Sequence, residues 1–388
     1  MDKSQKLRDS LKNVHRIVVK VGSAVLVQKT GRPDLSRIDS IIQQLSRLHH
    51  AGKEIVLVSS GAIAAGVEAL GLGHRPTVLP KLQMAASIGQ VRLMTEYARL
   101  FKLEGCKVGQ VLLTRDDLKN RARHLNARNT MMALLKQRII PVINENDVVS
   151  VDEIKFGDND LLAALVTILL EADVLILLTS TDGLQKLNRS RESRRVPYLK
   201  SVTEEAIAMA SGRGNEFSSG GMASKLRSAQ TAVDVGINVV IADGRSDDVI
   251  AKILDGQDVG TLIGTSSEKK NTTMNRRKRW IAFFHKATGS LIVDNGAEEA
   301  LLENNVSLLP IGIRSIEGEF SKGALVNIKS MSGQLIAKGL VDYSSDQIAR
   351  IKGQRTQEIQ RILGSKDYEE VIHRENMVIV VEKQGGNS

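Results

Sequence analysis

Two lysines far apart in the sequence lie beside glycines, in patterns that suit the binding of a phosphate. Lys20 ends an apolar segment and is followed by the residues VGS, so its ammonium can point into a cleft where backbone N–H groups approach an anion. Lys225 ends the segment 218–225, SSGGMASK, at the start of a helical pattern, where N–H groups and hydroxyls can cradle an anion. Taken alone, each pattern fits an ordinary surface lysine or a flexible helix cap equally well.

Two serines follow the apolar segment IVLV and precede an alanine-rich helical pattern. Small residues at this turn, Ser59 to Ala62, leave N–H groups exposed at a helix N-terminus, which suits a carboxylate or phosphate ligand. An N-capping serine explains the segment better when it is considered by itself. The sequence has no GxxxxGK[ST], GxGxxG or GxSxG motif, so a nucleotide would have to be held by another device.

Amides and carboxylates are concentrated in segments 144–147 (NEND) and 156–160 (FGDND). Carboxylates can bind the ammonium group of an amino acid and amides its carboxylate, and the same oxygens can hold Mg²⁺. Turns rich in Asn and Asp are also common for structural reasons. The density of polar side chains beside an apolar segment favours a binding site.

Strand and helix patterns alternate from Arg16 to about Gly264. A helical pattern with one apolar face occupies residues 37–52, and strand patterns are short runs rich in aliphatic residues. This alternation predicts an α/β fold, with a mostly parallel sheet sandwiched by helices. Ligands of such sheets bind beyond the carboxyl ends of the strands, where the polar segments lie. We expect strands at residues 16–22, 54–62, 107–113, 139–147, 172–181 and 237–244.

The composition is that of a globular chain, with 42% hydrophobic and 25% charged residues among 388. The one cysteine, Cys106, excludes an intrachain disulfide and predicts a cytoplasmic location. The apolar stretch Leu161 to Leu178 contains Glu171 and Asp173, which are costly in lipid, so it predicts a buried helix followed by a buried strand. The net charge of +10 fits phosphorylated ligands or nucleic acid, and equally a general surface property.

The character of the chain changes after residue 264. Residues 265–275 are polar and predict a linker between a first domain at 14–264 and a second at 276–360. Short apolar runs broken by glycines predict that the second domain is small and β-rich, with a C-terminal extension at 361–388. These runs are WIAFF, GSLIVD, SLLPIGI, ALVNIKS and LIAKGLVDY.

The motifs together carry a specific resemblance. KVGSAVL, VSSGAIAAG, NENDVV, FGDND and SSGGMASK stand in the order and approximate spacing of the amino acid kinase superfamily, and within it they resemble the glutamate 5-kinase family. The tail is similar to the PUA domain appended to many members, through NRRKRWI, GSLIVDNGA, SLLPIGI and GEFSKGALVNI. The resemblance implies ATP-dependent phosphorylation of the γ-carboxylate of L-glutamate, the first step of proline biosynthesis.

The resemblance also implies roles for single residues. The catalytic residues are Lys20 and Lys225, which contact the transferring phosphoryl group, and Asp160, which orients the lysines or the metal. The amino acid is bound by Ser60, Asp147 and Asn159. ATP is bound by Lys20, Thr179, Ser180, Ser219, Gly220, Gly221, Met222, Ala223, Ser224 and Lys225. Mg²⁺ accompanies ATP, and no residue is assigned as a dedicated metal ligand.

Two features depart from the family pattern. Members usually have an acidic residue directly after the Thr or Ser that ends the apolar run, whereas this chain has Ser180, with Asp182 two residues later. The nucleotide contact at this point therefore stays open between Ser180 and Asp182. The basic insertion at residues 188–198, NRSRESRRVPY, is expected to form a surface loop.

Alternative functions remain. Other superfamily members act on aspartate, acetylglutamate, carbamate or UMP, but the PUA-like tail argues against them. An RNA-binding protein is the alternative of another class, although the nearly balanced charge and few aromatic residues of the tail make a poor RNA surface. The resemblance further implies a homo-oligomer and proline as a feedback ligand. We expect no membrane association.

Overall fold

The chain divides into two compact units, Met1–Thr272 and Thr273–Ser388. The computed structural model describes residues 3–28, 33–119, 121–149, 159–187, 193–211, 221–264, 287–304, 306–366 and 368–380. The linker expected at residues 265–275 lies outside the described residues.

The first unit is built on an eight-stranded sheet with the order β3-β4-β2-β1-β5-β9-β10-β8. Adjacent strands run parallel except β9 and β10, which pair antiparallel. The strands are β1 (Arg16–Val21), β2 (Glu54–Val58), β3 (Lys107–Leu113), β4 (Ile139–Glu145), β5 (Val174–Thr179), β8 (Tyr198–Leu199), β9 (Asn238–Asp243) and β10 (Thr261–Ile263). Each predicted strand is present, and the mostly parallel α/β fold is confirmed.

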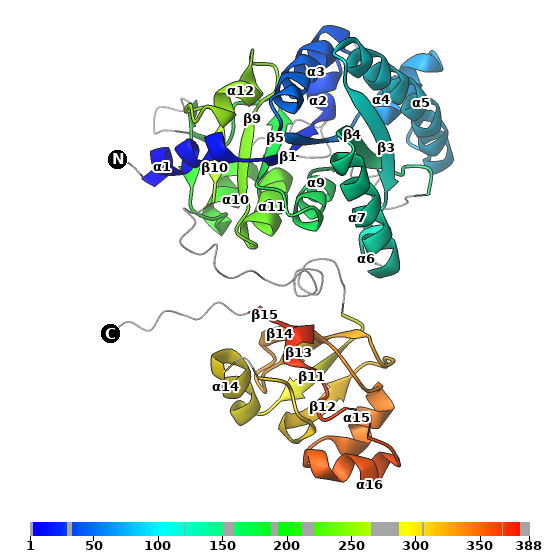
Figure 1. The fold of residues 1–388 in the computed structure, drawn as a ribbon, viewed down its shortest axis with the longest axis vertical. Helices are drawn as coiled ribbons and strands as arrows, with labels where there is room; N and C mark the ends of the chain where they lie inside the picture. Colours follow the sequence, from blue (N-terminus) through cyan, green and yellow to red (C-terminus); the bar gives the residue numbers. More distant parts are fainter. Residues whose placement is uncertain are drawn as a thin grey trace. The chain divides into compact units, whose positions relative to one another are not determined.

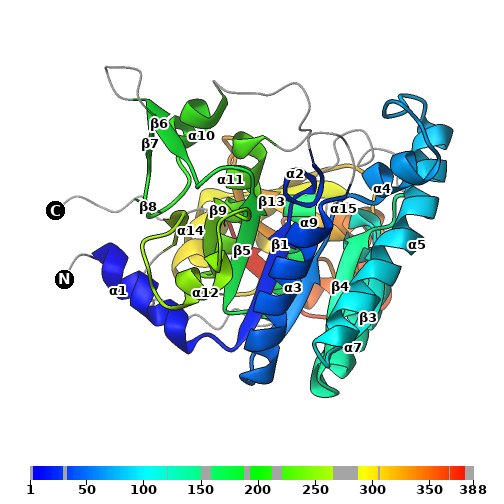
Figure 2. The ribbon, with the colours of Figure 1, turned by 90° about the horizontal axis from the view of Figure 1, so that it is seen from above.

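Helices cover both faces of this sheet (Figures 1 and 2). On one face lie α3 (Leu35–His50), α5 (Leu79–Leu103) and α12 (Val249–Leu254), which share one apolar core with the strands. On the other face lie α7 (Arg121–Lys136), α9 (Asn159–Leu169) and α11 (Met222–Val233). The remaining helices of this unit are α1 (Lys3–Ser10), η1 (Leu11–Asn13), α2 (Ser23–Leu26), α4 (Ala62–Ala69), α6 (Arg115–Lys119) and α10 (Glu204–Ser211).

The apolar stretch from Leu161 to Leu178 forms most of α9 and then β5, as predicted. All six residues of β5 are buried, because helices cover both faces of the central strands. None of the helices in the described parts of the chain is long and apolar enough to cross a membrane.

The expectation of a surface loop at residues 188–198 is wrong for its second half. Residues Ser193–Arg195 form β7, which pairs antiparallel with β6 (Gln185–Leu187). Strand β8 then joins the edge of the main sheet beside β10, where Tyr198 packs against the apolar core. Basic composition suggested a solvated loop, but Arg195 is neutralised by carboxylates of the first unit. Residues 188–192 lie outside the described residues.

The second unit has a five-stranded sheet with the order β12-β11-β13-β14-β15. Its strands are β11 (Gly289–Val293), β12 (Ile313–Glu317), β13 (Leu325–Lys329), β14 (Leu335–Leu340) and β15 (Met377–Ile379). Its helices are α14 (Asn295–Asn304), η2 (Pro310–Gly312), α15 (Ser345–Ile351), η3 (Thr356–Glu358), α16 (Ile359–Leu363) and η4 (Arg374–Asn376). These elements enclose an apolar core of their own, which confirms the predicted β-rich unit.

The domain boundary expected at residue 360 departs from the structure. Strand β15 pairs antiparallel with β14, and Val371, Ile372 and Met377 are buried in the second core. The first part of the expected extension is therefore part of the folded unit, because its apolar side chains complete that core. Of the five apolar runs, WIAFF (280–284) lies outside the described residues.

Candidate active site

Three charged side chains meet in the interior of the first unit. Lys20 Nζ lies 2.6 Å from Asp160 Oδ1, and Lys225 Nζ lies 2.9 Å from Asp160 Oδ2. The side chain of Asp160 is fully buried, and those of the two lysines are 5% and 8% exposed. The three residues that sequence reasoning named as catalytic are thus in direct contact.

Three elements bring these side chains together. Lys20 is near the carboxyl end of β1, the strand that pairs with β2 and β5, opposite Val58 and Leu177. Asp160 is in the first turn of α9 and Lys225 is in the first turn of α11. Helices α9 and α11 pack against each other, so their first turns lie together beyond the end of β1. The arrangement follows the rule for parallel sheets that sites form at carboxyl strand ends.

The cluster carries two positive charges and one negative charge. Burial acts to raise the pKa of Asp160, but attraction to Lys20 and Lys225 and their hydrogen bonds outweigh it and hold that pKa well below its ordinary value. Asp160 is therefore ionised at neutral pH. The excess positive charge at a strand end suits a phosphate-bearing ligand.

Ser60 lies at the start of α4 with its side chain buried. Its hydroxyl oxygen has no hydrogen-bond partner among the residues that the structure describes. Gly61 is the N-cap of α4, with φ 98° and no side-chain cap; this φ favours glycine. A buried, unpartnered hydroxyl next to an uncapped helix N-terminus is suited to accept a ligand carboxylate.

Close helix packing fixes the position of α4. A Cβ on Gly66 would lie 1.7 Å from the carbonyl oxygen of Ala85, and a Cβ on Gly89 would lie 1.7 Å from that of Ala62. The backbones of α4 and α5 therefore touch at these two glycines. The start of α4, with Ser60, is held in place by this contact.

A buried amide network lies beside Ser60. Asn159 Nδ2 donates to the carbonyl oxygen of Ser59 at 2.6 Å and to Asn144 Oδ1 at 2.7 Å. Asn144 Nδ2 in turn donates to Gln90 Oε1 at 2.7 Å. These bonds hold the ends of β2 and β4 and the start of α9 together, so Asn159 lies close to Ser60 and directly before Asp160.

Asp147 and the nucleotide candidates Thr179 and Ser180 lie at the carboxyl ends of other strands of this sheet. Asp147 follows β4 and is half-buried. Thr179 is the last residue of β5, and its carbonyl oxygen accepts from Gly244 N at 2.9 Å. Ser180 comes next, and its carbonyl oxygen accepts from Arg245 Nη2. These residues lie at carboxyl strand ends of the same sheet as Lys20.

The glycine-rich segment is described only from Gly221 onward. Gly221 is the N-cap of α11, and no side chain caps this helix in the described part of the chain. Met222, Ala223 and Ser224 form its first turn, with Lys225. Ser219 and Gly220 lie outside the described residues. An uncapped helix N-terminus beside a lysine is an arrangement that binds phosphate.

Sequence reasoning missed several residues that support the site. Tyr97 of α5 shares a 2.8 Å hydrogen bond with the hydroxyl of Ser59, and burial raises the pKa of Tyr97 to about 12. Gln90 of α5 fixes Asn144, although 54 residues separate them. No local pattern marks Gln90 or Tyr97, because each is an ordinary residue of a long helix until the fold brings its partner close.

Comparisons with known proteins agree with this arrangement. The model of the amino acid kinase family matches residues 15–243, and that of the PUA domain matches residues 289–363. The glutamate 5-kinase of Moorella thermoacetica is 43% identical over 375 residues, which cover 96% of this chain and 98% of that protein. That of Geobacter sp. strain M21 is 45% identical over 375 residues, 96% of this chain and 100% of that protein. The glutamate 5-kinase of Geobacter sulfurreducens is 45% identical over 372 residues, which cover 95% of this chain and 99% of that protein.

The two family models match long segments and not only single motifs, and the PUA model covers the tail. The chain therefore belongs to the amino acid kinase family and, within it, to the glutamate 5-kinases.

Proposed function

We propose that this protein transfers the γ-phosphoryl group of ATP to the γ-carboxylate of L-glutamate. The products are glutamyl 5-phosphate and ADP, and the reaction is the first step of proline biosynthesis. The observation that carries the proposal is the buried cluster of Lys20, Asp160 and Lys225 at the carboxyl end of the central strands. The similarity to glutamate 5-kinases along almost the whole chain supports it.

The chemistry suits a site with cations and no strong base. The γ-carboxylate of glutamate has a pKa of about 4.3, so it is already an anionic nucleophile at neutral pH. One of its oxygens attacks the γ-phosphorus in line, and the bond to the β–γ bridging oxygen breaks as ADP leaves. Lys20 and Lys225 neutralise the charge that develops on the phosphoryl oxygens. Asp160 would hold both ammonium groups in place.

Glutamate would bind on the β2–β4 side of this centre. The free hydroxyl of Ser60 and the N-terminus of α4 are suited to a substrate carboxylate, and Asn159 lies beside them. The carboxylate of Asp147 would meet the substrate ammonium group, because opposite charge fixes the orientation of an amino acid.

ATP would bind on the β5–α11 side. Thr179 and Ser180 would lie beside the nucleotide, and residues 219–225 would wrap its phosphates, with Lys225 ending that segment. Mg²⁺ would arrive bound to the phosphates of its substrate complex with ATP, a common mode for this ion. In the described residues there is no cluster of three or more His, Cys, Asp or Glu side chains able to hold a metal.

The test is release of ADP with ATP and Mg²⁺, using glutamate, aspartate, acetylglutamate and UMP as separate acceptors. We expect turnover with glutamate, and trapping of the acyl phosphate by hydroxylamine as a hydroxamate. Turnover of another acceptor with none for glutamate would overturn the proposal.

Three further expectations belong with this function. Proline would inhibit as the end product of the pathway, the chain would form a homo-oligomer, and the reaction would take place in the cytoplasm. Cys106 is buried and free, in line with a reducing compartment. Inhibition by proline and light scattering of the purified protein test the first two.

A further inference from the structure

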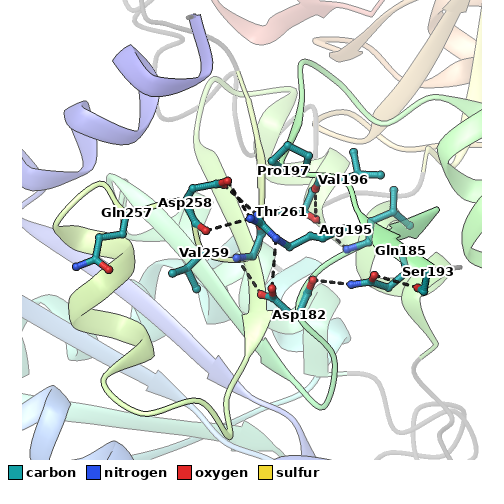
Figure 3. A network of polar contacts seen from close by, with 12 residues as sticks. Asp182, Gln185, Ser193, Arg195, Val196, Pro197, Gln257, Asp258, Val259 and Thr261 are labelled. Carbon is teal, nitrogen blue, oxygen red and sulfur yellow. Dashed lines mark hydrogen bonds and ion pairs between the residues drawn. The ribbon is translucent and has the colours of Figure 1, made fainter. Parts of the chain in front are cut away.

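Arg195 of β7 contacts two other segments of the first unit, the loop after β5 and the segment before β10 (Figure 3). Its Nε lies 3.3 Å from Asp182 Oδ2, and its Nη2 lies 2.9 Å from Asp258 Oδ2. Its Nη1 donates to Asp258 Oδ1 at 3.0 Å and also to the carbonyl oxygen of Gly260. The side chain is only 21% exposed. All three guanidinium nitrogens are therefore engaged, which the planar fork of arginine allows and a lysine cannot match.

Asp182 is held on both carboxylate oxygens. While Oδ2 faces Arg195, Oδ1 accepts from Gly260 N at 3.0 Å. Gly260 has φ 63°, and a Cβ there would lie 2.3 Å from the carbonyl oxygen of Ile241, so glycine is required. The side chain of Asp182 is thus fastened to β7 by a charged contact with Arg195 and to the segment before β10 by a neutral contact with Gly260.

Asp182 belongs to the short loop that follows β5, and it lies two residues after Ser180. The first part of this loop is fastened by Gly244 N and Arg245, which donate to the carbonyl oxygens of Thr179 and Ser180. Asp182 fastens its second part. These contacts hold the loop from β9 on one side and from β7 and β10 on the other.

We propose that Arg195 is a positioning residue for nucleotide binding, which it promotes by holding the loop of residues 180–183 through Asp182. The proposal rests on the nucleotide site proposed above. It also assigns Asp182 a structural role, because its carboxylate oxygens are used within the protein. Ser180, whose side chain is not part of this network, is then the residue that faces the nucleotide. Fixing a loop before binding raises affinity by lowering the entropy lost on binding.

The experiment compares Arg195→Gln with Arg194→Gln, its matched control. Arg194 is the adjacent residue of β7, is exposed, and makes no ion pair in the described parts of the chain. For Arg195→Gln we expect the KM for ATP and the Kd for ADP to rise about tenfold, as for loss of a charge-assisted contact. The kcat and the KM for glutamate of Arg195→Gln should stay within about twofold of the parent values. For Arg194→Gln, the kcat, both KM values and the Kd for ADP should all stay within about twofold of the parent values.

Asp182→Asn supplies a second, nearly isosteric test that does not depend on how well Arg195→Gln folds. It should weaken ADP binding to a similar extent. The Kd of the double variant for ADP should lie within about twofold of the Kd of each single variant, because both substitutions remove the same contact. Arg195→Lys should recover part of the affinity.

Unchanged ADP affinity in folded Arg195→Gln or in Asp182→Asn would overturn the inference. Equal losses in kcat and in both KM values would overturn it as well, since that result indicates general loosening of the unit. A parent protein that binds ADP but does not phosphorylate glutamate would overturn the proposed function instead, and the ADP comparison would still decide the role of Arg195.

Discussion

At the scale of single residues, two buried cations share one buried carboxylate. Asp160 is fully buried and contacts both Lys20 and Lys225. Such a cluster is costly to desolvate, and its stability depends on each partner being present. The cluster contains more positive than negative charge, so the same arrangement needs its carboxylate for stability and is suited to attract an anionic ligand such as a phosphate.

Lys20→Ala and Lys225→Ala should each lower kcat by about 10²-fold, because loss of one donor to transition-state charge costs about 3 kcal/mol. The measurement is glutamate-dependent release of ADP, made below the melting temperature of each variant. Lys102→Ala, at an exposed site in the last turn of α5, is the control and should keep its activity. Near-normal kcat for either active-site variant would place the phosphate elsewhere.

Asp160→Asn should reduce the free energy of unfolding at neutral pH by about 3–5 kcal/mol, because two buried ammonium groups lose their counter-charge. The pKa of Asp160 is lowered in the folded state. A carboxylate of this kind contributes stability above its unfolded pKa of about 3.9, and loses it as pH falls from there toward the folded pKa.

The stability difference between the parent and Asp160→Asn should therefore be constant near neutral pH and shrink below about pH 4. Urea unfolding of both proteins across a pH series measures it. A difference that does not change with pH would contradict the role of the ionised carboxylate.

Ser60→Ala should raise the KM for glutamate about tenfold or more, because a hydrogen bond to a charged group is worth about 1.5–3 kcal/mol. The free energy of unfolding should stay the same or rise, since the substitution removes a buried hydroxyl without a partner in the described structure. Ser87→Ala, at an exposed site on α5, is the matched control. An unchanged KM for glutamate would remove Ser60 from the substrate site.

At the scale of elements, the packing of α4 on α5 decides where the proposed glutamate-binding end of the site lies. The two helices touch through Gly66 and Gly89, and Ser60 and Gly61 directly precede α4. Helix α5 also supplies Gln90 and Tyr97 to the network behind the site. A shift of this helix pair would move the groups proposed to bind glutamate relative to Lys20, which is fixed in the sheet.

Gly89→Ala should destabilise the protein and raise the KM for glutamate. Alanine favours a helix by about 1 kcal/mol over glycine. However, the added methyl would lie 1.7 Å from the backbone of Ala62, and overpacking of this kind costs about 1–3 kcal/mol. Gly73→Ala, where a Cβ meets nothing within 4 Å, is the control. Thermal melting and glutamate kinetics measure both effects, and a stabilised Gly89→Ala with normal KM would refute the close contact.

At the scale of the whole molecule, the candidate active site and the tail belong to different compact units. All described candidate residues lie in Met1–Thr272, and the second unit has its own apolar core. Units of this kind usually fold independently, because few side chains of one complete the core of the other. The tail can then influence regulation or assembly without supplying groups to the reaction.

A chain ending at residue 267 should therefore fold and keep its kcat within about tenfold of the full chain, a barrier change of about 1.4 kcal/mol. Cooperative melting of residues 1–267 and glutamate-dependent ADP release measure this. Sensitivity to proline and the size of the oligomer are compared in the same preparations. A truncated protein that melts cooperatively but has no activity would mean that the tail completes the active site.

The local pattern of the sequence was sufficient for the elements, and it marked the segments that carry the candidate site. Alternating aliphatic and amphipathic segments determine strands and helices through burial and periodicity, and strand ends in a parallel sheet meet at one edge. Lys20, Asp160 and Lys225 lie in segments near the ends of such elements, but it was the family resemblance that named them together. Their family resemblance then supplied the roles that the residues alone left open.

Only the tertiary structure decided what depends on contacts between distant segments. The pairs Gln90–Asn144 and Asp182–Arg195 join ordinary polar residues whose partners lie on other elements, so no periodicity marks them. Strand β15 lies in the segment expected to be a C-terminal extension. It belongs to the second unit because it pairs with β14 and buries Met377 in that core. Arg195 was expected in a basic surface loop, yet it lies in β7 and contacts two carboxylates and two carbonyl oxygens. Only folding brings these partners close enough to stabilise its charge.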